Sequence, residues 1–163
     1  MAMLQVTSVS GGYPGVHVLD DVSCSVDQGE VVALFGHNGA GKSTLLKAIF
    51  GLIDDVSGSV QFGDEEVLGE SPKRLTHSGI AFVPQEHGVF PRLTVAENLN
   101  MGIWARGADR GSDHEGDLEQ VFEYLPLLKA RWRSHAGDLS GGAATDAEHW
   151  QSLVDRSETA HAR

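Results

Sequence analysis

Apolar and polar residues alternate in short stretches near the start of the chain, a pattern typical of β-strands. Residues 4–9 alternate loosely and end at the turn-forming run 11–15. Residues 22–26 alternate again, and the tight turn at 27–29 is expected to join them, as a hairpin, to residues 30–35. After Glu30 this last run is continuously apolar, and it therefore predicts a core strand buried on both faces.

A helical pattern follows the next, glycine-rich stretch. Apolar residues recur over 45–50, and Gly51 is placed to end the predicted helix. Residues 58–63 predict another short strand, and residues 80–83 predict a buried strand that stops at Pro84. Strands and helices mixed in this way predict an α/β fold.

The second half of the chain is patterned mainly as helix. Thr94 and Glu97 have the spacing of a capping box, which predicts a helix that begins there and ends before the loop 107–116. Apolar residues recur at helical spacing over 118–128, although Pro126 limits where that helix can run.

Composition narrows the class of protein. The 163 residues fit one domain, and 40% hydrophobic residues suffice for a globular core. Acidic residues outnumber basic ones 23 to 12, so a net charge of −11 gives no general attraction to nucleic acid, which is not an expected partner. The single cysteine, Cys24, is consistent with a reducing cytoplasm. No apolar run approaches the roughly 20 residues that cross a bilayer.

The strongest chemical signal is the P-loop pattern, in which two glycines with four residues between them precede a lysine and a hydroxyl residue. Glycines let successive backbone N–H groups point at phosphate oxygens, and the helix that follows aims its positive end at the same place. Lys42 would contact the β- and γ-phosphates of ATP, Ser43 would ligate Mg²⁺, and Thr44 would help to hold the α-phosphate. A turn that binds nothing does not require these residue types. The expected nucleotide-binding residues are Gly36, His37, Asn38, Gly39, Ala40, Gly41, Lys42, Ser43 and Thr44.

With the P-loop in place, the sequence resembles the ATP-binding subunits of ABC transporters. Three further segments match that family in the right order: Tyr13 upstream of the P-loop, Gln85 after the second buried run, and residues 139–142, Leu-Ser-Gly-Gly, at the start of the signature motif. The resemblance implies a P-loop NTPase of ABC ATPase type, with an antiparallel β subdomain and a helical subdomain, incomplete at the C-terminus.

The resemblance also assigns roles to these residues. Tyr13 would stack on adenine, and Gln85 would contact Mg²⁺ and the attacking water. Ser140, Gly141 and Gly142 would bind the γ-phosphate of ATP held by a second ATP-binding subunit in a head-to-tail dimer. The other implied partners are transmembrane permease subunits and, indirectly, a periplasmic solute-binding protein. The implied location is cytoplasmic, peripheral on the inner face of the cell membrane.

Two segments refine the resemblance. Residues 82–86 and 89–99 look like those of importers for branched-chain amino acids, with urea and short-chain amide importers as close relatives. In such importers the permease and the solute-binding protein choose the cargo, so no residue of this chain is expected to contact it.

The resemblance breaks after Gly142. The family has a glutamine where this chain has Ala143, and its later strand ending in Asp-Glu and its switch histidine are not found over 143–163. The codons from residue 143 onward can also be read from their second base, with the degenerate bases chosen freely. The amino-acid sequence encoded in that shifted frame is compatible with QQQMLSIGRALSIDPRLLMLD or a sequence close to it. Tryptophan has a single codon, so Trp150 forces a glycine in the shifted frame, at a position where the family also has glycine.

We therefore hypothesise a single-base frameshift near Gly142. The expected organisation is a partial ATP-binding domain over residues 1–142 and an aberrant, poorly ordered tail over 143–163. Three functions stay open for this chain: a transport ATPase in its intact parent, an ATP-binding fragment without turnover, or a product without function. A small-molecule kinase is a fourth possibility, although such an enzyme has no use for residues 139–142.

Overall fold

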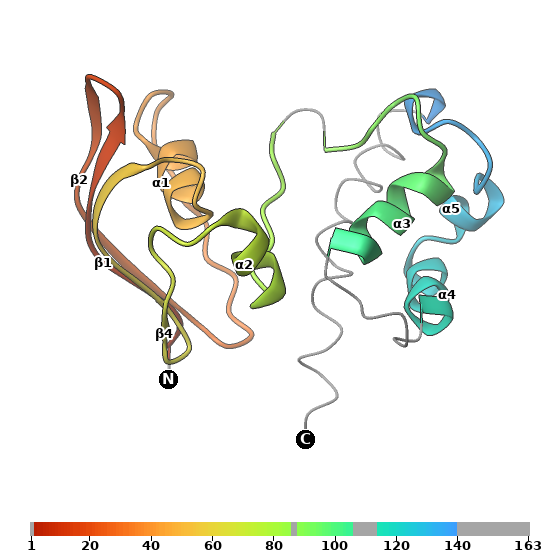
Figure 1. Ribbon diagram of the computed structural model, residues 1–163, viewed down its shortest axis with the longest axis horizontal. Coiled ribbons are helices and arrows are strands. Elements are labelled where there is room, and N and C mark those ends of the chain that lie inside the picture. Colours follow the sequence, from red (N-terminus) through yellow and green to blue (C-terminus); the bar gives the residue numbers. More distant parts are fainter. Residues whose placement is uncertain (1, 86–87, 106–113, 140–163) are drawn as a thin grey trace. The chain divides into compact units, whose positions relative to one another are not determined.

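The structure is a computed structural model that describes residues 2–85, 88–105 and 114–139. Its contacts divide the chain into two compact units, residues 1–75 and residues 76–163 (Figure 1). The expected boundary at residue 142 lies outside the described residues, as does the whole tail after it.

The first unit is built on a four-stranded antiparallel sheet with the strand order β2-β1-β3-β4. β1 and β2 form a long hairpin, and the turn between them needs only two residues, so the predicted loop 11–15 is mostly strand. The strands are β1 (Ala2–Tyr13), β2 (Val16–Asp27), β3 (Asp55–Phe62) and β4 (Glu65–Glu66).

An irregularity in β1 explains how its core residues are placed. Val6 and Val9 are both fully buried, although side chains three residues apart point to opposite faces of a regular strand. The pairing with β2 shifts its register between these two residues, and Ser8 between them has a φ of 49°. The shift therefore turns both valines toward the same core.

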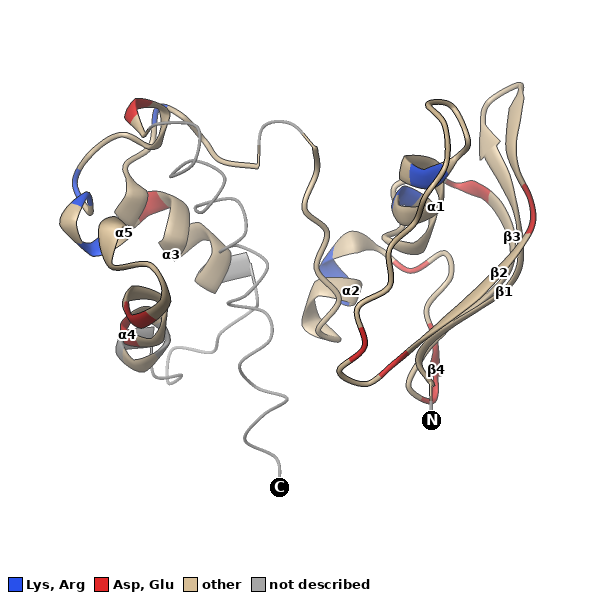
Figure 2. Ribbon diagram, turned by 180° about the vertical axis from the view of Figure 1, so that it is seen from behind, with Lys and Arg blue, Asp and Glu red and all other residues tan. Residues whose placement is uncertain are grey.

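Helix α1 (Lys42–Ile49) lies on one side of this sheet in both views (Figures 1 and 2). It buries Leu45, Ala48 and Ile49, and Gly51 at φ 66° ends it as predicted. A Cβ at Gly51 would lie 2.1 Å from the carbonyl oxygen of Glu70, so only glycine fits this close approach to the segment before α2 (Pro72–His77).

Two predicted core strands are not strands in the structure. Residues 30–35 and residues 80–83 belong to no strand, and the predicted hairpin of 22–26 with 30–35 is wrong because β2 pairs with β1 instead. A strand buried on both faces needs hydrogen-bonded neighbours. Neither run has such a neighbour in the described part of the chain.

The second unit is helical. Its core cluster is formed by residues that are all at most 4% exposed: Val95, Leu99, Ile103, Val121 and Leu128. Phe122 and Trp132 pack against this cluster, and their rings meet edge to face with centroids 5.4 Å apart. The helices are α3 (Val95–Ala105), α4 (His114–Tyr124) and α5 (Pro126–Ala130), followed by a short 3₁₀ helix, η1 (Ala136–Asp138).

The helices of this unit follow the sequence pattern closely. The predicted capping box opens α3, and Pro126 divides the predicted helix 118–128 into α4 and α5 because proline is tolerated only at a helix start. Among the described helices, none combines the length and the apolar character that crossing a membrane would require.

Candidate functional site

The P-loop begins where the apolar run 30–35 ends, and its backbone depends on glycine. Gly39 and Gly41 have φ angles of 87° and 85°, in the left-handed region that side chains with a Cβ rarely adopt. The N–H of Ala40 donates to the carbonyl of His37 at 3.2 Å, which closes the turn. The strand, loop and helix order expected around this motif is therefore present in part, since the helix forms and the preceding strand does not.

The loop leads directly into the N-terminus of α1. Gly41 is the N-cap, and its carbonyl accepts the first helical hydrogen bond from Leu45 N–H at 2.8 Å. The first turn contains no acidic residue, and α1 carries Lys42 and Lys47 (Figure 2). Free N–H groups and the positive end of the helix dipole thus favour an anion at this end.

Lys42 already points into the loop. Its Nζ donates to the carbonyl oxygens of Gly36 at 2.8 Å and of His37 at 2.9 Å. The side chain is half-buried, and these two bonds hold the ammonium group against the carbonyl groups at the start of the loop. A phosphate oxygen placed there would meet a fixed positive charge.

The two hydroxyl residues after Lys42 differ in their surroundings. Thr44 is only 8% exposed, whereas Ser43 is exposed. Mg²⁺ in phosphate-transfer sites keeps several waters and takes only one or two protein ligands besides phosphate oxygens. The exposed hydroxyl of Ser43 fits one such ligand. Among the described residues there is no cluster of three His, Cys, Asp or Glu that could hold a metal without phosphate.

Tyr13 lies in the same unit as the P-loop, at the end of β1. Its side chain is 39% exposed. Val18 of β2 connects the two regions: a Cβ at Gly12 would lie 3.3 Å from Val18 Cγ2, and a Cβ at Gly41 would lie 3.4 Å from Val18 Cγ1. The hairpin end that carries Tyr13 and the N-terminus of α1 therefore pack against the same valine.

The remaining predicted site residues do not belong to the described part of the first unit. Gln85 is exposed and belongs to the second unit. Ser140, Gly141 and Gly142 lie outside the described residues. Their predicted roles stay predictions.

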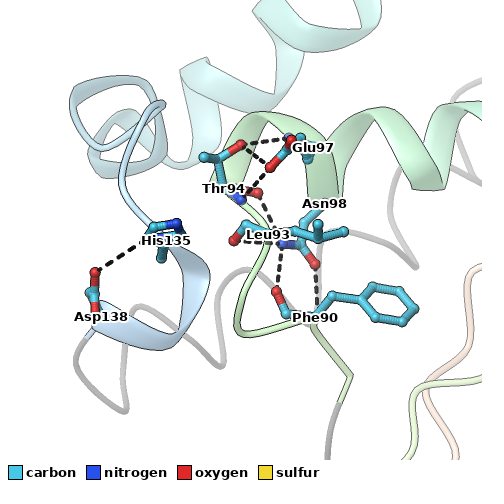
Figure 3. A network of polar contacts seen from close by, with 7 residues as sticks. All are labelled: Phe90, Leu93, Thr94, Glu97, Asn98, His135 and Asp138. Carbon is cyan, nitrogen blue, oxygen red and sulfur yellow. Dashed lines mark hydrogen bonds and ion pairs between the residues drawn. The ribbon is translucent and has the colours of Figure 1, made fainter.

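Sequence reasoning missed a buried polar residue in the second unit. Asn98 is 3% exposed and binds the loop that precedes α3 (Figure 3). Its Oδ1 accepts from Phe90 N–H at 2.8 Å, and its Nδ2 donates to the carbonyls of Phe90, Leu93 and Thr94 at 3.1, 3.4 and 2.9 Å. An asparagine one residue after a capping glutamate, following a Pro-containing loop, is the only sequence signal for this role.

The capping box is formed in full beside Asn98. Thr94 N–H donates to Glu97 Oε2 at 2.7 Å, the Thr94 hydroxyl donates to the same oxygen at 2.8 Å, and Glu97 N–H donates to Thr94 Oγ1 at 3.2 Å. The backbone N–H of Thr94, then its hydroxyl, hold the pKa of Glu97 below its usual value, and the charge of His135 adds to this.

Comparison with known proteins agrees with this geometry. The high-affinity branched-chain amino acid transport ATP-binding protein BraG of Pseudomonas aeruginosa is 42% identical over 140 residues, which are 86% of this chain and 59% of that protein. The probable branched-chain amino acid transport ATP-binding protein LivF of Archaeoglobus fulgidus is 37% identical, over 86% of this chain and 58% of that protein. A solved nucleotide-free ATP-binding cassette from an ABC transporter matches with a TM-score of 0.77 and 30% identity, over 95% of this chain and 66% of that one.

The fold and the P-loop therefore define an ATP-binding cassette. Residues 19–158 match the family described as ABC transporter, and the chain belongs to that family. It spans about 59% of the length of BraG.

Proposed function

We propose that this chain binds MgATP at residues 36–44 as the nucleotide-binding part of an ABC importer subunit. The observation that carries the proposal is the position of Lys42 Nζ, held by the carbonyls of Gly36 and His37 at the N-terminus of α1. Phosphate would bind the free N–H groups of the loop and the ammonium group, and Mg²⁺ would bridge phosphate oxygens and the Ser43 hydroxyl.

Adenine would stack on Tyr13. The ring is partly exposed, and the shared contact of the hairpin and α1 with Val18 supports a single site for base and phosphates. Gln85 would contact Mg²⁺ and the attacking water. The residues Ser140, Gly141 and Gly142 would serve the nucleotide of a second ATP-binding subunit.

We further propose that the intact parent energises uptake of branched-chain amino acids, with urea or short-chain amides as alternative cargoes. The names of BraG and LivF support the first of these. The parent would work with transmembrane permease subunits on the cytoplasmic face of the membrane, and a periplasmic binding protein would deliver the solute.

The chain as written would bind ATP without turning it over. Hydrolysis in this family uses a glutamate after an apolar strand and a switch histidine, and the sequence over 143–163 offers neither in a matching context. A frameshift near Gly142 accounts for this. Sequencing the DNA across codons 138–145 tests that account: one extra or missing base supports it, and an intact frame with no apolar strand in the neighbouring frame contradicts it.

The binding site itself is tested by comparing ATP with inorganic tripolyphosphate, which has the phosphates and no base. We expect Tyr13→Ala to weaken ATP binding by about tenfold or more and to leave tripolyphosphate binding unchanged, because stacking is worth about 1–3 kcal/mol. Tyr124→Ala, at a 71% exposed tyrosine of the second unit, is the matched control. Equal ATP affinity in all three proteins would contradict the assignment of Tyr13.

A further inference from the structure

Positive charge is concentrated at one place in the helical unit. Residues 124–135 contain Lys129, Arg131 and Arg133 and no acidic residue, in a chain whose net charge is −11. All three side chains are exposed. Figure 2 shows blue residues on α5 and on the turn that follows it, and red residues on α3 and α4. This turn therefore has the opposite charge to the chain as a whole.

Two large side chains beside these charges are exposed as well. Tyr124 is 71% exposed, and Leu127 is 49% exposed although its neighbour Leu128 is buried in the core cluster. Arg131 N–H donates to the Leu127 carbonyl at 3.0 Å, so Leu127 and Arg131 lie one above the other on the same side of α5. The buried Leu128 thus fixes α5 with Leu127 turned outward.

We call Tyr124, Leu127, Lys129, Arg131 and Arg133 the basic patch. Its charges are not neutralised within the described part of the chain, where no carboxylate forms an ion pair with them. The Nζ of Lys129 lies 5.6 Å from the centroid of the Phe122 ring, and such a contact leaves the full charge on the ammonium group. Three positive charges are therefore presented to an external anion.

The apolar members of the patch favour one kind of anion. Lys and Arg beside an exposed tyrosine and leucine are typical of protein surfaces that lie on a bilayer. Basic side chains attract anionic headgroups, and the tyrosine ring is suited to the boundary between headgroups and water. A second copy of this chain would bring a net charge of −11 toward another −11, which opposes self-association.

We propose that the basic patch docks on a membrane surface of anionic lipid. Lys129, Arg131 and Arg133 bind headgroup phosphates, and Tyr124 and Leu127 enter the headgroup layer. Each basic residue near an anionic surface contributes about fivefold, so three of them give weak and reversible binding that orients the unit. The docking goes beyond the proposed function and uses no residue of the nucleotide site.

Co-sedimentation of the full 163-residue chain with lipid vesicles tests the proposal. Vesicles of mixed phosphatidylcholine and phosphatidylglycerol are compared with vesicles of phosphatidylcholine alone at low ionic strength. We expect binding only to the vesicles that contain phosphatidylglycerol. Raising the salt concentration should release the chain, because the attraction to headgroups is screened by ions.

Variants with equal net charge isolate the patch. Arg131→Gln/Arg133→Gln should weaken vesicle binding by about 25-fold, the product of two fivefold losses. Lys47→Gln/Lys73→Gln removes the same charge from the first unit and should weaken binding much less. Arg131→Lys/Arg133→Lys keeps the charge and should retain binding. Tyr124→Ala should weaken binding at every salt concentration, because its contribution is not a charge.

Four results would overturn the proposal. The first two are no binding to phosphatidylglycerol vesicles, and equal weakening by the two glutamine double variants. The third is a self-associated chain that dissociates in Arg131→Gln/Arg133→Gln, which would make a second copy the occupant. The fourth is tighter binding to soluble poly-glutamate than to vesicles of equal anionic charge, lost in the same variant, which would assign the patch to an acidic protein segment.

MgATP binding is measured on the same samples to separate this proposal from the nucleotide site. MgATP binding without vesicle binding overturns only the docking. Vesicle binding by a chain that does not bind MgATP overturns only the nucleotide site.

Discussion

At the scale of single residues, two glycines of the P-loop have nearly the same backbone angle and different surroundings. Gly39 has a φ of 87° and open space where a Cβ would lie, whereas Gly41 has a φ of 85° and Leu19 Cδ2 only 3.3 Å from that position. The first glycine is required by conformation alone. The second is required by conformation and by packing against β2.

This difference gives a paired prediction. We expect Gly39→Ala to lower the free energy of unfolding by about 1–2 kcal/mol, the cost of a left-handed angle for a residue with a Cβ. Gly41→Ala should cost more, because the tight contact with Leu19 adds to the same strain. Denaturant unfolding of both variants measures this. Equal costs would show that packing at Gly41 contributes nothing.

Asn98 is the second residue whose role can be isolated. We expect Asn98→Leu to destabilise the protein by about 1–3 kcal/mol, because the N–H and carbonyl of Phe90 and the carbonyls of Leu93 and Thr94 lose a buried partner. Asn100→Leu, at an exposed position of the same helix, is the control and should change stability little. Similar unfolding free energies for the two variants would contradict the role given to Asn98.

At the scale of elements, the start of α3 responds to pH through Glu97. Hydrogen bonds from Thr94 hold the pKa of Glu97 below its usual value. The ionised carboxylate therefore stabilises the folded chain at every pH above that usual value. That contribution is lost as the pH falls through the lowered pKa. We expect the thermal midpoint of the wild type to exceed that of Glu97→Gln at neutral pH and to converge with it in acid. A difference that persists unchanged in acid would contradict this account.

Elements were predictable where local chemistry decides them. Gly51 ends α1, the Thr94–Glu97 pair opens α3 and Pro126 separates two helices, since each acts through the backbone of its own neighbourhood. Residues 30–35 and 80–83 show the limit of such reasoning. Their apolar pattern predicts buried strands, and this prediction is wrong for the described structure. A strand forms only when other segments supply its hydrogen bonds.

At the scale of the whole molecule, the sequence predicted the family and the P-loop from residue types and spacing, and the structure adds how Lys42 is held. The close approach of both Gly12 and Gly41 to Val18 could not be foreseen, because it depends on how a hairpin curves against a helix. Gln85 belongs to the second unit, and its role stays a prediction.

The central claim is that the P-loop of this chain binds MgATP and that the chain does not hydrolyse it. Equilibrium binding of MgATP, with phosphate release followed on the same samples, tests both halves for the wild type, Lys42→Ala and Lys47→Ala. Lys47 is in the last turn of the same helix, so its variant removes the same charge away from the loop.

We expect the wild type and Lys47→Ala to bind MgATP alike and Lys42→Ala to bind about 10- to 100-fold more weakly, as the loss of a charged hydrogen-bond donor implies. Phosphate release should match the Lys42→Ala background in every sample. Equal binding by all three proteins would contradict the site, and phosphate release by the wild type above that of Lys42→Ala would contradict the absence of turnover.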